Sequence, residues 1–178
     1  MSASSHHAFV LMGVSGSGKT VIASELARRL SAAFLDGDFL HPRANIDKMA
    51  RGEPLNDDDR APWLAKINDA IYAMQRTQPV SLVVCSALKR QYRDRLRQDS
   101  RNLTFLWLKG DYAVIESRMK ARKNHFFKPQ MLQTQFATLE APGADEPDVI
   151  ALDISVPVEE VIAQAQAAIA RVTGTCAD

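Results

Sequence analysis

Short apolar runs alternate with longer amphipathic stretches along most of the chain. Five runs are almost continuously apolar, and they cover residues 8–12, 33–35, 80–85, 103–108 and 149–152. Such runs are typical of parallel strands that are buried on both faces of a sheet. Between them, apolar residues recur at helical spacing, first at Ile22, Leu26 and Leu30 and later from Val158 to Val172. The alternation predicts an α/β fold in which helices flank a parallel sheet of five strands.

Two segments depart from this alternation. Residues 36–60 hold seven acidic side chains against four basic ones, and residues 118–128 hold five basic side chains and no acidic one. We interpret the first as part of an acceptor-binding insertion at about residues 38–64, and the second as part of a lid at about residues 118–130. The chain has no internal repeat and no Gly/Ser linker, so we expect both segments to belong to a single domain of residues 1–178.

Composition and charge narrow the class of protein. The chain has 178 residues, of which 46% are apolar and 24% are charged, as in an ordinary folded domain. The formal net charge of +1 excludes a general attraction to nucleic acid or to an anionic membrane. The two cysteines, Cys85 and Cys176, match neither a disulfide framework nor a zinc-ligand spacing. Residues 8–14 lack the basic flank and cleavage site of a signal peptide, and no run is long enough to span a membrane. We therefore expect a cytoplasmic protein that acts on a small molecule.

The strongest motif lies at residues 13–20, where GVSGSGKT matches the full pattern G-x-x-x-x-G-K-[ST]. It follows a predicted strand and opens a predicted helix, as this phosphate-binding loop requires. Glycines let the backbone turn tightly, so that consecutive N–H groups and a helix N-terminus point at phosphate oxygens. We expect Lys19 to reach the β- and γ-phosphates as a catalytic cation, and the Thr20 hydroxyl to ligate Mg²⁺. The predicted ATP-binding residues of the loop are Gly13, Val14, Ser15, Gly16, Ser17, Gly18, Lys19 and Thr20.

Other motifs restrict the kind of protein that carries this loop. A GTPase would have D-x-x-G and N-K-x-D motifs, and neither occurs in the chain. An ATPase motor would usually have an acid at the end of the third strand, whereas residues 80–85 run into Ser86 and Ala87. The acids follow the second strand instead. This placement is typical of kinases that phosphorylate small molecules.

Asp36 and Asp38 are the two acids at that strand end, and they can serve different purposes. We assign Asp36 to Mg²⁺ through a water molecule, and Asp38 to the acceptor hydroxyl, which it would orient before it takes up the proton late in the transfer. His41 is a second candidate partner for a hydroxyl. A simple turn around Gly37 would account for the same acids without a function.

Two pairs of cations complete the candidate site. Lys89 and Arg93 are four residues apart and share one helix face, and together with Arg60 they can hold a carboxylate. Arg118 and Arg122 have the same spacing. We assign Arg118 to the nucleotide, and Arg122 to the phosphates in transfer as a catalytic cation. A solvated basic helix and a basic surface loop are the respective alternatives.

Three longer motifs carry a resemblance to a known family. They are DGDFLHP at residues 36–42, GEPLNDDDR at residues 52–60 and CSALK at residues 85–89. Together with RKNHFF at residues 122–127 and QF at residues 135–136, they closely resemble the bacterial gluconokinases. The likeness extends over about residues 8–172. Thr20, where the family often has serine, and Asn124, where a lid glycine is common, are small departures from it.

The resemblance implies ATP-dependent phosphorylation of D-gluconate at its 6-hydroxyl, which yields 6-phospho-D-gluconate and ADP and uses Mg²⁺. It also implies a homodimer and a three-layer α/β/α P-loop kinase fold similar to that of nucleoside monophosphate kinases and shikimate kinase. The residues alone indicate a P-loop kinase of an anionic, polyol-like acceptor. They leave open a kinase for another acceptor, such as shikimate or adenosine phosphosulfate, and a non-catalytic ATP sensor.

Overall fold

The computed structural model describes residues 6–122 and 128–175, and its centre is a parallel sheet of five strands in the order β2-β3-β1-β4-β5. Every neighbouring pair of strands is parallel. This arrangement confirms the sheet that the apolar runs predict. The strands are β1 (His7–Met12), β2 (Ala33–Asp36), β3 (Val80–Val84), β4 (Leu103–Lys109) and β5 (Val149–Asp153).

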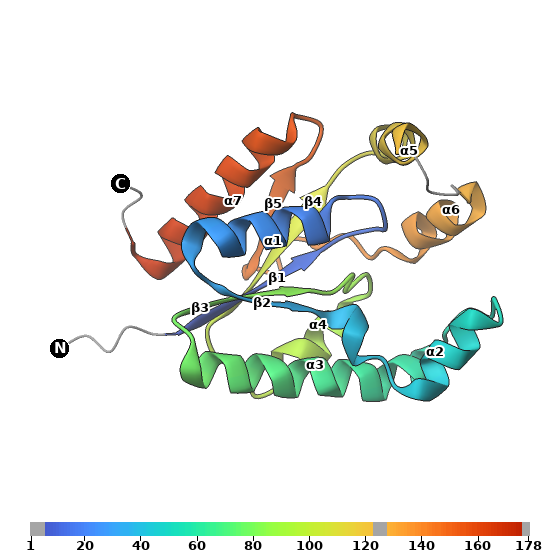
Figure 1. The fold of residues 1–178 in the computed structure, drawn as a ribbon, viewed down its shortest axis with the longest axis horizontal. Coiled ribbons are helices and arrows are strands. Elements are labelled where there is room, and N and C mark those ends of the chain that lie inside the picture. Colours follow the sequence, from blue (N-terminus) through green and yellow to red (C-terminus); the bar gives the residue numbers. More distant parts are fainter. Residues whose placement is uncertain (1–5, 123–127, 176–178) are drawn as a thin grey trace.

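Helices cover both faces of this sheet, so the fold has three layers (Figure 1). One face lies against α1 (Lys19–Leu30) and α7 (Val158–Thr173). The other face lies against α3 (Asp57–Thr77) and α4 (Arg90–Arg97). The predicted three-layer α/β/α architecture is therefore confirmed.

Strand β1 shows why a central strand of this sheet is apolar without interruption. Phe9 and Leu11 pack into the core under α1 and α7, whereas Ala8, Val10 and Met12 pack into the core over α3 and α4. Successive residues of a strand face opposite sides, so both sets must be apolar when helices cover both faces.

The remaining short elements lie beyond the carboxyl ends of the strands. They are η1 (Gly37–Leu40), α2 (Arg43–Ala50), α5 (Tyr112–Ala121) and α6 (Pro129–Thr138), and Figure 1 shows them on the right-hand side of the molecule. The segment 38–64, which we expected to bind the acceptor, holds η1, α2 and the first turns of α3. The centre of the expected lid, residues 123–127, lies outside the described residues. Within the described ranges, no helix is long and apolar enough to cross a membrane.

The order of the strands determines where a ligand can bind. Central β1 has β3 and then β2 on one side, and β4 and then β5 on the other. In open parallel sheets, ligands bind outside the carboxyl ends of the strands, at the point where the chain changes direction across the sheet. At this edge, β1 ends in the glycine loop, β2 ends at Asp36, and β3 is followed by Ser86. The fold therefore gathers the glycine loop, Asp36 and Ser86 at one edge of the sheet.

Candidate active site

The glycine loop, residues 13–18, connects β1 to α1 and forms the floor of the site. Gly16 has a φ of 79°, and a Cβ there would lie 2.6 Å from the Cγ of Met119, so the position favours glycine on two grounds. Gly18 is the N-cap of α1 and provides no side-chain cap. The first N–H groups of α1 are therefore available to an anion, which the positive end of the helix dipole also attracts.

Lys19 begins α1, and its ammonium group lies inside the loop. Its Nζ donates hydrogen bonds to the carbonyl oxygens of Gly13 and Val14, at 3.0 and 2.9 Å. Burial lowers the pKa of Lys19 to about 8, although the negative charges of Asp38 and Asp36 oppose the shift. A partly buried cation that is held by neutral carbonyls is well suited to pair with the phosphates of a nucleotide.

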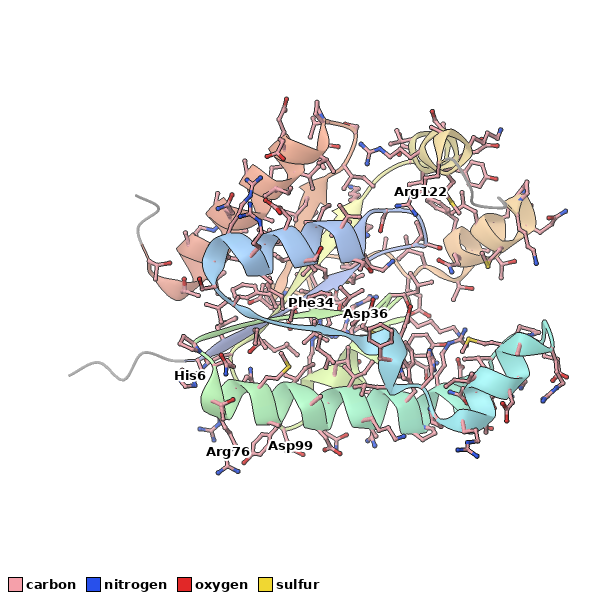
Figure 2. The ribbon with its side chains drawn as sticks, in the orientation of Figure 1. His6, Phe34, Asp36, Arg76, Asp99 and Arg122 are labelled. Atoms are coloured by element: carbon pink, nitrogen blue, oxygen red, sulfur yellow. The ribbon has the colours of Figure 1, made fainter. Side chains whose placement is uncertain are left out.

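Asp36, at the end of β2, links the glycine loop to the next turn of the chain. Its Oδ2 accepts a hydrogen bond from the Thr20 hydroxyl at 3.3 Å, and its Oδ1 accepts one from the backbone N–H of Asp38 at 3.0 Å. The second bond caps η1 and thereby fixes the turn that carries Asp38. Figure 2 shows Asp36 at the same end of the sheet as Arg122, far from His6.

Asp38 is one of the residues that line the main cavity of the site. Partial burial and the neighbouring charge of Asp36 raise its pKa, while His41 and Lys19 act in the opposite direction. A carboxylate with a raised pKa is a better proton acceptor than an ordinary aspartate. Its place beside the glycine loop suits a group that orients a hydroxyl for attack on a phosphate.

The main cavity, of about 350 Å³, joins the glycine loop to distant parts of the chain. It is lined by Ser15, Gly16, Gly18, Lys19, Thr20, Val21, Asp38, Val84, Ser86, Arg122 and Gln135. A second pocket, of about 260 Å³, shares Gly16, Gly18 and Arg122 with it and extends to Arg118 and Val158. Two pockets that continue along one glycine loop suit an elongated ligand with several phosphates.

The two arginines that the sequence assigns to the nucleotide and to the phosphates both line pockets beside the glycine loop. Arg122, the C-cap of α5, lines both pockets, whereas Arg118 lines only the second one. The Nη2 atom of Arg118 also donates to the carbonyl oxygen of Val156 at 3.0 Å, which ties α5 to the loop before α7. This hydrogen bond holds the Arg118 guanidinium at the wall of the second pocket.

His41, which follows η1, is held by two side-chain contacts. Its ring stacks on Trp63 with a centroid distance of 4.2 Å, and its Nδ1 accepts a hydrogen bond from Asn45 Nδ2 at 3.3 Å. Trp63 is itself fixed, because its Nε1 donates to the Gly37 carbonyl at 2.8 Å. Burial lowers the pKa of His41, and Arg60 adds to this effect while Asp38 opposes it. The ring is therefore oriented near Asp38, and the lowered pKa favours its neutral form. In the tautomer that accepts from Asn45, Nε2 carries the N–H.

Arg60 and Lys89 lie together around the ring of Tyr92. The Arg60 Cζ and the Lys89 Nζ are each 5.6 Å from the centroid of that ring. Lys89 also donates to both carboxylate oxygens of Asp57, at 3.1 and 3.2 Å. The structure thus brings two of the three cations predicted for a carboxylate into one cluster, although neither of them lines the main cavity.

Arg93 lies elsewhere, and the structure corrects the prediction that it binds a substrate carboxylate. Its side chain is only 1% exposed, and all five of its N–H groups are used inside the protein. It pairs with both carboxylate oxygens of Glu146 at 2.7 Å. The other bonds go to the carbonyl oxygens of Ala87, Leu88 and Glu140. Arg93 therefore holds the turn after β3 in place and is not available to a ligand.

Gln135 and Ser86 also line the main cavity, and the sequence alone predicts no role for either. The Gln135 Oε1 accepts a hydrogen bond from the backbone N–H of Ser15 at 2.5 Å. Ser86 contacts the loop through its carbonyl oxygen, which accepts the N–H of Gly13 at 3.2 Å. Gln135 appeared in the sequence only within a family motif. A single polar residue on a predicted helix gives no further signal of its position in the fold.

Comparison with known proteins places the chain among its relatives. A family model described as an AAA domain matches residues 9–142. The chain is 69% identical over 158 residues to the thermoresistant gluconokinase of Escherichia coli strain K12, a match that covers 89% of this chain and 90% of the relative. It is 51% identical over 161 residues to the thermosensitive gluconokinase of the same strain, which covers 90% and 86% of the two chains.

Solved structures agree with these relatives. A gluconokinase from Sinorhizobium meliloti 1021 superposes with a TM-score of 0.85 at 42% identity, over 96% of this chain and 95% of that one. A Mycobacterium tuberculosis adenosine phosphosulfate kinase, at 18% identity and a TM-score of 0.65 over 92% and 97% of the two chains, shares the fold. With a phosphate-binding loop, paired aspartates and cationic flanks at one edge of a parallel sheet, and with relatives at this level of identity, the chain belongs to the gluconokinase family.

Proposed function

We propose that this protein transfers the γ-phosphoryl group of ATP to the 6-hydroxyl of D-gluconate, producing 6-phospho-D-gluconate and ADP. The single observation that carries the mechanism is the composition of the main cavity. Lys19 and Thr20, at the start of α1, line it together with Asp38 and Arg122. One cavity is thus surrounded by a phosphate-binding floor, a proton acceptor and a cation on a long side chain. Phosphoryl transfer requires these three groups around one space.

The nucleotide lies along the two pockets in this proposal. Its phosphates accept hydrogen bonds from the loop amides and the N-terminus of α1, and Lys19 exchanges its carbonyl partners for phosphate oxygens. The nucleoside extends into the second pocket, where Arg118 and Val158 form part of the wall. Arg122 touches both pockets, so it can stabilise the charge of the phosphoryl group in transfer.

The residues at the end of β2 fit a magnesium ion. Mg²⁺ is bound through a few protein oxygens, several waters and the phosphates of a nucleotide, and the Thr20 hydroxyl lies beside the Asp36 carboxylate. In the described ranges no three acidic, histidine or cysteine side chains cluster so that they could hold a metal ion by themselves. When bound, Mg²⁺ neutralises charge on the β- and γ-phosphates. Thr20 would ligate it directly and Asp36 through water.

We assign residues to the hydroxyl and carboxylate groups of gluconate by their charge and their position. Asp38 accepts a hydrogen bond from the 6-hydroxyl of gluconate, orients its oxygen for attack and takes up its proton late in the transfer. The neutral His41 ring offers its Nε2 to another hydroxyl group. Arg60 and Lys89, clustered around Tyr92, attract the carboxylate at the other end of the substrate.

The reaction is tested by following ADP formation with MgATP and gluconate, shikimate or no acceptor. We expect turnover that depends on gluconate, with a product that 6-phosphogluconate dehydrogenase oxidises, and no such turnover in Lys19→Ala. Turnover with shikimate alone would favour another acceptor. ATP binding without turnover of any acceptor would favour an ATP sensor and would contradict the proposal.

We also propose that the protein acts in the cytoplasm and that the basic segment at residues 118–130 serves as a lid. On the basis of the family resemblance, we propose that it forms a homodimer. Light scattering on the purified chain measures the mass in solution and would contradict the dimer if it gave the 19.7 kDa of a single chain.

A further inference from the structure

The hydrogen bond between Gln135 and Ser15 places a neutral side chain in the position of an anion. Backbone N–H groups of a phosphate-binding loop normally donate to phosphate oxygens. Here the Ser15 N–H donates to the amide oxygen of Gln135 at 2.5 Å. Gln135 comes from α6, 120 residues further along the chain, so this contact is a product of the tertiary fold.

The helix that carries Gln135 is anchored on both sides. Leu132, one turn earlier, is 1% exposed in the core, and the ring of Phe136 packs on Tyr112 of α5 at 5.5 Å. Just after the helix, the backbone N–H of Glu140 donates to the Leu88 carbonyl at 2.9 Å. The position of the Gln135 side chain at the loop is therefore set by packing.

Gln135 lies at one particular end of the nucleotide site. It and Ser15 line the main cavity, which also holds Asp38, the proposed proton acceptor. Neither Gln135 nor Ser15 lines the second pocket, which Arg118 does line and in which we place the nucleoside. The phosphate that approaches Gln135 is consequently the terminal one, which is the group that ATP has and ADP lacks.

We propose that Gln135 is a specificity-determining residue that recognises the γ-phosphate. Without nucleotide, its Oε1 accepts the hydrogen bond of the Ser15 N–H. When ATP binds, a γ-phosphate oxygen takes that N–H, and the amide of Gln135 turns so that its Nε2 donates to the same phosphate. An amide can do both because it carries an acceptor oxygen and a donor nitrogen on one rotatable bond. This inference rests on the proposed kinase function.

Two variants separate the acceptor and donor roles. Gln135→Glu keeps the shape and the bond to Ser15 but removes the donor and adds a charge that repels the γ-phosphate. Gln135→Ala removes both bonds. Gln133→Glu is the matched control, because it adds the same charge to an exposed position of the same helix.

The decisive measurement is the dissociation constant of a non-hydrolysable ATP analogue and of ADP, without gluconate, so that it is independent of the acceptor. We expect Gln135→Glu to weaken binding of the ATP analogue on the order of 10-fold or more relative to binding of ADP. The reason is that a hydrogen bond to a charged group is lost and a repulsion is gained. We expect Gln135→Ala to weaken it less, in the same direction, and Gln133→Glu to keep the wild-type ratio.

Each outcome decides one question. Circular dichroism shows whether the Gln135 variants are folded. If both are folded and the ratio of the two dissociation constants stays at the wild-type value, even with weaker binding of both nucleotides, the proposed recognition role is wrong and the contact is only structural. If one variant does not fold, the other decides in the same way. If the ratio shifts as expected but gluconate is not phosphorylated, the inference about Gln135 stands and the proposed acceptor is wrong.

Discussion

Arg93 and Glu146 form a buried ion pair that joins α4 to the segment after α6. The Arg93 Nη2 lies 2.7 Å from the Glu146 Oε1, and the two side chains are only 1% and 3% exposed. Arg93 also binds the carbonyl oxygens of Ala87 and Leu88, which immediately precede Lys89. The pair therefore fixes the turn that follows β3 and, through it, one wall of the active site.

Neutralising one partner of this pair should destabilise the fold strongly. In Glu146→Gln, the Arg93 charge stays buried without its carboxylate, so we expect the free energy of unfolding to fall by about 3–5 kcal/mol. Urea denaturation measures it. Glu53→Gln is the matched control, since Glu53 pairs with Arg51 at the surface and should contribute at most about 1 kcal/mol. Equal effects of the two variants would contradict the importance of the buried pair.

The same pair predicts how stability depends on acid. Hydrogen bonds from Arg93 and Arg97 lower the pKa of Glu146 from 4.5 to about 2. The folded state therefore holds this carboxylate ionised where the unfolded state protonates it, and the resulting stability is complete above pH 4.5 and is lost as the pH falls towards 2. We expect the free energy of unfolding of the wild type to decline over this window more steeply than that of Glu146→Gln. Parallel curves would show that Glu146 is not the group responsible.

Lys19 predicts a second dependence on pH, in the binding of ATP. Burial lowers its pKa to about 8 in the nucleotide-free chain, so the ammonium group loses its charge as the pH rises through this value. We expect kcat/KM for ATP to fall above about pH 8, whereas kcat at saturating ATP should hold to higher pH because bound phosphates restore the charge. A kcat/KM profile that stays level well above that pH would contradict this explanation.

Asp38→Asn tests the proposed proton acceptor. The substitution keeps the size of the side chain and removes its ability to accept a proton, so we expect kcat to fall on the order of 10²–10⁴-fold. The affinity for ATP, measured by equilibrium binding, should be retained because the loop amides and Lys19 are untouched. A folded variant with wild-type turnover would remove Asp38 from the mechanism.

Lys89→Ala tests the assignment of the gluconate carboxylate. Losing a charged hydrogen bond should raise KM for gluconate by about 10-fold or more, with little change in KM for ATP. Arg95→Ala is the control, because Arg95 is an exposed cation of α4, the helix that begins directly after Lys89. If both variants raised KM for gluconate equally, the basic character of the helix would matter and the particular position of Lys89 would not.

Local patterns were sufficient to predict much of this protein. The uninterrupted apolar runs predict a five-stranded parallel sheet, because a strand that is buried on both faces needs apolar residues at successive positions. The glycine loop was found for a similar reason, since a tight phosphate-binding turn needs particular residues at consecutive positions. The motifs around Asp38 and Lys89 identified the gluconokinase family, which the comparison with known proteins confirms. The roles of Lys19, Asp36, Asp38, His41 and Arg122, the homodimer and the cytoplasmic location stay predictions.

Only the tertiary structure decided which polar residues face the site. Lys89 and Arg93 look equivalent in the sequence, yet Lys89 lies beside Asp57 and Tyr92. Arg93 is instead enclosed by Glu146, which is 53 residues away from it. Gln135 had no local signal, because its partner Ser15 is 120 residues distant. The sequence by itself determined the elements and the phosphate loop, which depend on neighbouring residues. Burial and the choice of ion-pair partner depend on distant segments that meet only when the chain has folded.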